Sequence, residues 1–254
     1  MNRLSKSQHA QELLTAYYWR EDVIRSRSVS EVVWTGILDI PAPSARLIAD
    51  WSKEISRLGL ETGDVEPLPL ARSRMNWPDY ANCVKAMSAW MRTLGLQDTL
   101  ASSDVALMTC TGAKYHLDAT YYGGAAFCNL FLSEDRGLDL HFPHTGYRIP
   151  LTRGATVIFD TGQPHAVIQR QSTSFNADDF TPDQDYNQVF LSWELPIEDV
   201  NVARALGVVF DIDPLNGLQM NEEQVWLNGG RVNVYPDSGR WMKRIDHTGA
   251  PPVA

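Results

Sequence analysis

Apolar residues recur at helical spacing in three segments of the first hundred residues, 5–24, 43–59 and 78–95. Such a spacing gathers the apolar side chains on one face of a helix. The second segment opens at Ser44, a favourable N-cap, and closes at Gly59, a residue type that commonly follows the last helical turn. We therefore predict three N-terminal supporting helices.

Between residues 104 and 195 the pattern changes to short apolar runs separated by Gly, Asp, Pro and Thr. Runs of this length are typical of antiparallel strands. The predicted strands are 105–110, 125–132, 138–142, 147–151, 156–159, 166–169 and 189–195. An extended segment at 29–40 can join them, whereas the prolines and glycine of 61–78 predict a loop. The pattern indicates an α+β, mainly β protein built on an antiparallel sandwich or jelly roll.

After Pro196 the sequence predicts a helix around 202–206 and a hairpin within 224–235, with Asn228-Gly229 as its turn. No linker demands a second domain. We expect a single domain over 1–254, with a helical support region (1–100), a jelly-roll core (101–196) and a C-terminal extension (197–254).

Composition narrows the classes of partner. The 254 residues are 44% hydrophobic and carry a net charge of −9, which disfavours nucleic acid and anionic membrane surfaces. No apolar stretch reaches the length of a membrane span, and the first residues lack the apolar run of an export signal. The three cysteines are far apart and form no CxxC pair. We expect a cytoplasmic protein with reduced, buried thiols and a small-molecule substrate.

Candidate metal ligands occur at two places in the strand-rich region. His116 and Asp118 are two residues apart, so both project to the same face of an extended segment. His165 follows a predicted strand and a tight turn. Two imidazoles and one carboxylate form the facial triad that holds Fe(II) and leaves its opposite face open.

These motifs resemble the Fe(II)/2-oxoglutarate-dependent dioxygenase superfamily over about residues 105–195. The matching parts are His116-x-Asp118, the segment 127–135, the strand 154–159 with His165-Ala-Val after it, and the final strand 189–195. The resemblance implies a double-stranded β-helix, and it implies that His116, Asp118 and His165 are the catalytic iron ligands. It also implies 2-oxoglutarate and O2 as co-substrates and hydroxylation of an aliphatic C–H bond in an amino acid or natural-product intermediate.

One departure from the family concerns the cation that usually binds the distal carboxylate of 2-oxoglutarate. Nine to eleven residues after His165 the chain has Ser174, Phe175 and Asn176, and counting back from the final strand gives Asn187 or Gln188. None of these is charged. The candidates elsewhere are Arg170, then Arg153 and Lys114, with Arg148 as a further choice, and an inward Asn129 can contact the co-substrate.

Two other interpretations of the sequence remain. The first is a cupin-like metalloenzyme that does not use 2-oxoglutarate, which is favoured because the usual cation for the distal carboxylate is missing. The second is a noncatalytic sandwich binding module, in which His116, Asp118 and His165 never converge. The long segment 171–186, with Phe175 and Phe180, is predicted to form a lid over the substrate.

Overall fold

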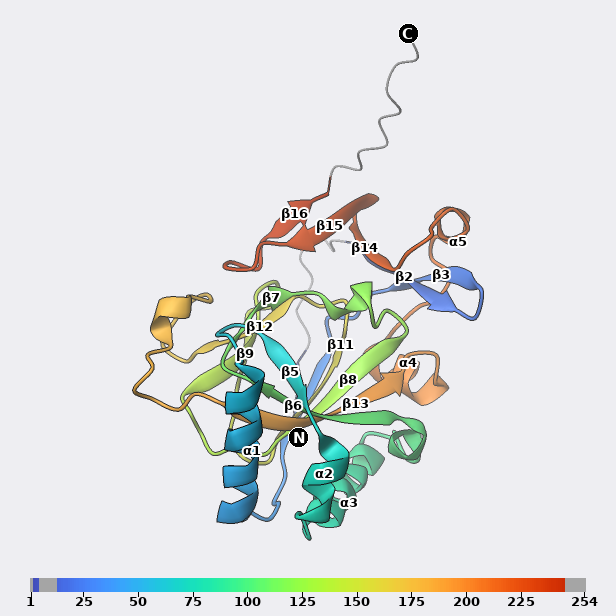
Figure 1. Ribbon diagram of the computed structural model, residues 1–254. Coiled ribbons are helices and arrows are strands. Elements are labelled where there is room, and N and C mark those ends of the chain that lie inside the picture. The colour runs from blue at the N-terminus through green and yellow to red at the C-terminus, as the bar shows by residue number, and fades with distance from the viewer. Residues whose placement is uncertain (1, 5–12, 245–254) are drawn as a thin grey trace.

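Three antiparallel sheets form the framework of the protein in the computed structural model, which describes residues 2–4 and 13–244 (Figure 1). The seven-stranded sheet has the order β1-β4-β11-β8-β13-β6-β5, the four-stranded sheet β10-β9-β12-β7, and the five-stranded sheet β16-β15-β14-β2-β3. The strands are β1 Asn2–Leu4, β2 Leu14–Arg20, β3 Val23–Ser28, β4 Val33–Ile37, β5 Val65–Leu68, β6 Asp104–Cys110, β7 Ala113–His116, β8 Ala125–Phe131, β9 Leu138–Phe142, β10 Tyr147–Pro150, β11 Ala155–Asp160, β12 His165–Gln169, β13 Gln188–Pro196, β14 Gln224–Leu227, β15 Gly230–Val234 and β16 Trp241–Lys243. The helices are α1 Ala45–Leu58, α2 Leu70–Met75, α3 Tyr80–Thr93, α4 Val200–Leu206 and α5 Pro214–Gly217, with 3₁₀ turns η1 Thr99–Ser102, η2 Asp118–Thr120 and η3 Ala177–Asp179.

Two apolar layers hold the seven-stranded sheet in place. On one face Phe131 and Val157 pack with Leu140 of the four-stranded sheet. On the other face Trp193 packs with Trp51 of α1 and with residues of α3. In Figure 1 the helices α1, α2 and α3 lie at one side of the molecule and the five-stranded sheet at the opposite side. The protein is thus mainly β, with a sandwich of two antiparallel sheets supported by helices.

The capping residues of α1 delimit the helix as the sequence predicts. The Ser44 hydroxyl accepts a hydrogen bond from the Leu47 amide at 3.2 Å, and Gly59 takes the left-handed conformation with φ 64°. The α3 helix is also confirmed, over Tyr80–Thr93. All three cysteines are buried and free, as expected.

The predicted helix over 5–24 is wrong where the structure describes it, because 14–20 and 23–28 form strands β2 and β3. Residues 5–12 lie outside the described part of the chain. All of Leu14–Tyr18 is buried, so β2 is covered on both faces and shows no alternation of polar and apolar residues. A run of this kind imitates helical spacing. The predicted loop 61–78 likewise contains β5 and α2.

The C-terminal hairpin is confirmed as β14 and β15. Its turn residues Asn228 and Gly229 both have positive φ, 50° and 79°, as a tight two-residue turn requires. Strand β14 also pairs with β2, so the five-stranded sheet joins residues 14–28 to residues 224–243. Within the described residues, no helix has both the length and the apolar character that a membrane crossing requires.

Candidate metal centre

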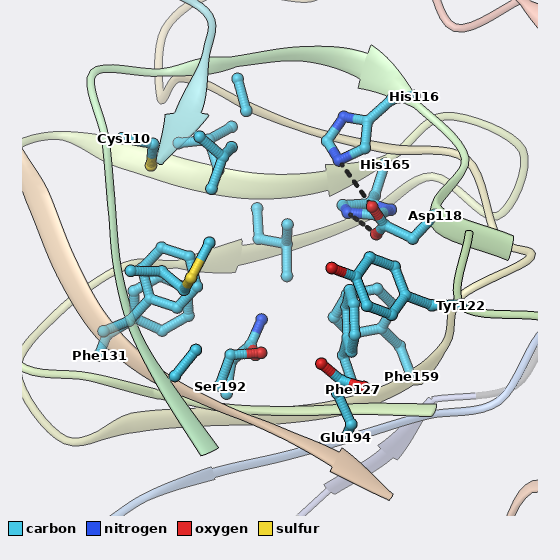
Figure 2. A pocket seen from close by; sticks show the side chains of 18 residues that line it. Cys110, His116, Asp118, Tyr122, Phe127, Phe131, Phe159, His165, Ser192 and Glu194 are labelled. Atoms are coloured by element: carbon cyan, nitrogen blue, oxygen red, sulfur yellow. Dashed lines mark ion pairs between the residues drawn. The ribbon is translucent and has the colours of Figure 1, made fainter. Parts of the chain in front are cut away.

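The structure brings His116, Asp118 and His165 together. His116 ends β7 and lies opposite His165, the first residue of β12, while Asp118 opens the 3₁₀ turn that follows β7. The Nε2 atom of His116 is 3.5 Å from one carboxylate oxygen of Asp118, and that of His165 is 3.3 Å from the other (Figure 2). One potential ligand atom from each residue lies within 4.8 Å of the others, which is a spacing that one metal ion can bridge.

Backbone carbonyls fix the orientation of both imidazoles. Nδ1 of His116 lies 2.7 Å from the carbonyl oxygen of Lys114, and Nδ1 of His165 lies 3.0 Å from that of Gln163. Because a carbonyl only accepts, each Nδ1 carries the proton and each Nε2 keeps its lone pair. Burial, reinforced by the neighbouring His116, lowers the pKa of His165 to about 4, so this ring is neutral near pH 7. Both rings are therefore prepared to bind a cation through Nε2.

The turn between β11 and β12 positions two of the candidate ligands, Asp118 and His165. The Thr161 carbonyl accepts hydrogen bonds from the backbone amides of Asp118 and Ala119, both at 3.0 Å. The turn that leads to His165 thus also holds the backbone of Asp118.

The same turn is anchored by Asp160, which is fully buried and forms a bidentate ion pair with buried Arg27 at 2.7 and 2.9 Å. The Asp160 carboxylate also accepts hydrogen bonds from the backbone amides of Ser30 and Gly162.

The triad faces a cavity of about 240 Å³ between the seven-stranded and the four-stranded sheet. Figure 2 shows Tyr122, Phe127, Phe159 and Glu194 at the same end of the cavity as the triad, with Cys110 and Phe131 at the far end. The lining residues are Val65, Ala106, Met108, Cys110, Ala113, His116, Asp118, Tyr122, Phe127, Asn129, Phe131, Leu140, Phe159, His165, Val167, Phe190, Ser192 and Glu194. Most are apolar, so a ligand on the open side of a bound metal would be shielded from water.

Polar groups other than the triad are few in this cavity. Asn129 and Ser192 face each other across the β8–β13 ladder, and Glu194 lies two residues beyond Ser192 on the same face. Burial raises the pKa of Glu194, and Asp104 raises it further. No Lys or Arg of the described residues lines the cavity.

The cations predicted to bind the co-substrate lie elsewhere and have other partners. Arg170 pairs with Asp135 at 2.8 Å and Asp139 at 2.9 Å. Arg153 pairs with Glu134, and Lys114 lies 3.8 Å from Asp64. Arg148 binds Asp139 and three backbone carbonyls. Of the four residues predicted to contact the co-substrate, Arg170, Arg153, Lys114 and Asn129, only Asn129 lines the cavity.

The positions counted back from the final strand do not supply the charge either. The side chain of Asn187 is engaged with Thr111 and Asp185. Gln188 is fully buried beside cavity-lining Cys110 in the β13–β6 ladder, and both of its amide atoms lack a hydrogen-bond partner. Neutral amides therefore occupy the positions where a cation was expected.

The segment 171–186 does not cover the cavity. Phe175 is buried and stacks on Phe180, whose ring contacts Tyr186. None of these residues lines the cavity: Phe175 packs with Tyr115 of β7 and Ile168 of β12, and Phe180 contacts both this cluster and the apolar cluster that contains Tyr186. The predicted lid is thus a packed segment in this structure.

The sequence did not identify Glu194 as a residue of the site. Alternation along β13 was the available signal, since Phe190, Ser192 and Glu194 share the face that borders the cavity. His141 lies in β9, where its Nδ1 is 2.6 Å from the Tyr115 hydroxyl.

Three solved structures illustrate what this chain is similar to. A prolyl-4-hydroxylase from Pseudomonas putida has 15% identity and a TM-score of 0.38, over 65% of this chain and 91% of that one. EvdO2 from Micromonospora carbonacea var. aurantiaca has 12% identity and a TM-score of 0.42, over 74% and 92%. SnoK, a non-haem alpha-ketoglutarate-dependent carbocyclase of nogalamycin biosynthesis, has 9% identity and a TM-score of 0.37, over 76% and 91%.

A structure of EvdO2 complexed with 2-oxoglutarate is also similar, with 13% identity and a TM-score of 0.36. Neither a family model nor a curated protein sequence matches the chain. With identities of 15% or less and TM-scores below 0.5, the likeness is distant.

Proposed function

We propose that this protein is a non-haem Fe(II)-dependent oxygenase with the architecture of a double-stranded β-helix, and that 2-oxoglutarate is its co-substrate. The observation that carries the proposal is the convergence of two Nε2 lone pairs and one carboxylate at the end of an apolar cavity. His116, Asp118 and His165 would hold the ion, and they leave its cavity side open.

The donor set fits Fe(II). Both histidines have their Nδ1 protons bound to carbonyls, and the Asp118 backbone is held by the turn that carries His165. Such outer contacts orient metal ligands before the ion arrives. When bound, Fe(II) with 2-oxoglutarate supplies the oxidation of an aliphatic C–H bond by O2.

The residues of the chain orient and shield the reactants. Phe159 packs beside His165, Phe127 packs against Phe159, and the two rings exclude water from that side of the metal site. Tyr122, at the same end, is 41% exposed and contacts the Phe127 ring. A cavity of about 240 Å³ suits a small molecule, so we propose hydroxylation of an amino acid or natural-product intermediate.

A second candidate function rests on the absence of Lys and Arg from the described lining of the cavity. A cupin-like metalloenzyme that does not use 2-oxoglutarate would need no cation there. The two candidates differ in one product, since only the first converts 2-oxoglutarate to succinate.

The deciding experiment loads the purified protein with Fe(II) without oxygen, then adds O2, 2-oxoglutarate and a panel of small amines, amino acids and natural-product intermediates. Succinate formation that is lost in His165→Ala supports the proposal. Stoichiometric Fe(II) binding without succinate, across the whole panel, would support the second candidate instead. A wild-type protein that binds no Fe(II) would contradict both.

A further inference from the structure

Asn129 is a buried polar residue that the fold itself does not satisfy. It is 6% exposed, it lines the cavity, and its Oδ1 has no hydrogen-bond partner. Buried polar groups are nearly always hydrogen-bonded in folded proteins. When the amide turns about its last bond, the NH2 group takes the position that lacks a partner, and a ligand with an acceptor oxygen would then satisfy it.

Strand register places this amide at a defined depth in the cavity. Phe127 pairs with Phe159, whose ring centroid is 4.7 Å from that of His165, so this row adjoins the metal centre. Asn129 lies two residues further along β8, a step of roughly 7 Å, and Ser192 lies directly opposite it on β13. In Figure 2 Ser192 lies between the triad end of the cavity and the end formed by Cys110 and Phe131.

This depth matches the shape of 2-oxoglutarate. Its keto acid end chelates a metal, and three carbon–carbon bonds separate the keto carbon from the second carboxylate carbon. A molecule chelated at the triad and extended into the cavity would bring that carboxylate to the row of Asn129 and Ser192.

Both side chains can donate hydrogen bonds to a carboxylate. A carboxamide turned about its last bond offers its NH2 group, and a serine hydroxyl donates its proton. Hydrogen bonds to a charged acceptor are stronger than those between neutral groups. The arginines and the lysine nearest in sequence to the site are held in ion pairs outside the cavity.

We infer that Asn129 and Ser192 bind the second carboxylate of 2-oxoglutarate through neutral hydrogen bonds, in place of a cation. The inference rests on the proposed function, and it assigns the specificity for a dicarboxylic 2-oxo acid to two uncharged residues. It also explains why β13 carries no arginine or lysine over Gln188–Pro196.

The test measures binding rather than turnover. Fe(II)-loaded protein is titrated without oxygen, and the visible charge-transfer absorption of a chelated 2-oxo acid gives Kd. The two probes are 2-oxoglutarate and 2-oxopentanoate, which has the same carbon chain with a methyl group in place of the second carboxylate. The variants are Asn129→Leu, Asn129→Asp and Ser192→Ala, and Asn82→Leu on the exposed side of α3 is the matched control.

We expect Asn129→Leu to weaken 2-oxoglutarate binding roughly tenfold to a hundredfold, the loss for a hydrogen bond to a charged group. Binding of 2-oxopentanoate should be unchanged or tighter. Asn129→Asp, which keeps the shape and adds a negative charge, should weaken 2-oxoglutarate at least as much and should separate a loss of contact from a loss of packing. Ser192→Ala should act in the same direction, and Asn82→Leu should match the wild type.

Three results would overturn the inference. If wild-type protein binds both acids equally, the second carboxylate has no anchor. If Asn129→Leu and Asn129→Asp both bind 2-oxoglutarate as the wild type does, the anchor lies elsewhere while the proposed function stands. Failure of both acids to bind iron-loaded wild-type protein would instead reject 2-oxoglutarate as co-substrate and the anchor with it.

Discussion

His116 lies directly opposite His165 in the antiparallel ladder between β7 and β12. Cross-strand partners share one face of a sheet, so the ladder closes a gap of 49 positions in the sequence and directs both imidazoles to the same point. Their ring centroids are 4.4 Å apart. The register of two short strands is therefore what builds the candidate metal centre.

Replacing His165 by Ala should abolish Fe(II) binding, because the remaining His116 and Asp118 offer only two protein ligands. The fold should persist, since the imidazole makes one hydrogen bond, to the Gln163 carbonyl. Calorimetric titration with Fe(II) under anaerobic conditions gives the stoichiometry, and circular dichroism monitors the fold. Full iron occupancy in a folded His165→Ala protein would show that the ion binds elsewhere.

The Arg27–Asp160 pair should be costly to break from one side. Both side chains are fully buried, so removing one leaves an uncompensated charge and should lower the free energy of unfolding by about 3–5 kcal/mol. Asp160→Leu and Arg27→Met test the two sides by urea denaturation. The combined variant Arg27→Met/Asp160→Leu should cost less than the sum of the single changes, and strict additivity would contradict coupling.

Alkaline pH should destabilise the protein through Tyr115. Burial raises the pKa of its hydroxyl to about 12, so the folded state favours the protonated form. The stabilisation is complete below the ordinary tyrosine pKa of about 10 and is lost as pH rises from there toward 12. Tyr115→Phe should lower stability at neutral pH by about 1–3 kcal/mol, because His141 loses its partner. It should also flatten the alkaline slope, which urea denaturation at several pH values would measure.

The three thiols should be inert in the native protein. Burial raises the pKa of Cys83 to about 11 and of Cys110 to about 12, and it raises that of Cys128 as well. A thiol reagent that absorbs on reaction should therefore count none in buffer and three in guanidinium chloride. Rapid labelling of the native protein would indicate that the core around these residues opens readily.

Glu194→Gln should tighten 2-oxoglutarate binding at neutral pH. Glu194 lies on the same face of β13 as Ser192, two residues closer to the triad end, so its charge repels an anion held there. Loss of that repulsion should lower Kd by roughly threefold to tenfold, while 2-oxopentanoate should gain less. An unchanged ratio of the two affinities would place the second carboxylate away from β13.

The parts of the fold that the sequence predicts are those with local causes. Ser44 and Gly59 delimit α1 by capping, and Asn228 and Gly229 dictate the hairpin turn by their backbone preferences. Strands β6, β8, β9 and β13 follow from apolar runs bounded by turn residues. The convergence of His116, Asp118 and His165 was predictable because His116 ends β7, Asp118 follows it two residues later, and His165 begins β12.

The parts that escaped prediction depend on partners far along the chain. The strand β2 is buried on both faces by contacts that its own residues do not specify. Arg170 looked suited to a co-substrate, but Asp139 lies beside it, since Leu138 pairs with Gln169 in the β9–β12 ladder. The sequence identifies a cationic residue, but it does not show with which carboxylate that residue pairs in the folded protein.

The pairing of β2 with β14 has a consequence for how the protein is made. Tyr17 pairs with Gln224, so the ribosome adds roughly 200 residues, in about 10–40 s at ordinary elongation rates, between the synthesis of the two partners. During that time the β2–β3 hairpin leaves the chain with one β2 edge lacking its neighbour, an edge that other nascent chains can pair with. The yield of folded protein in cells should therefore rise when translation is fast relative to the rate at which nascent chains meet. That yield depends on the rate of synthesis as well as on the stability of the fold.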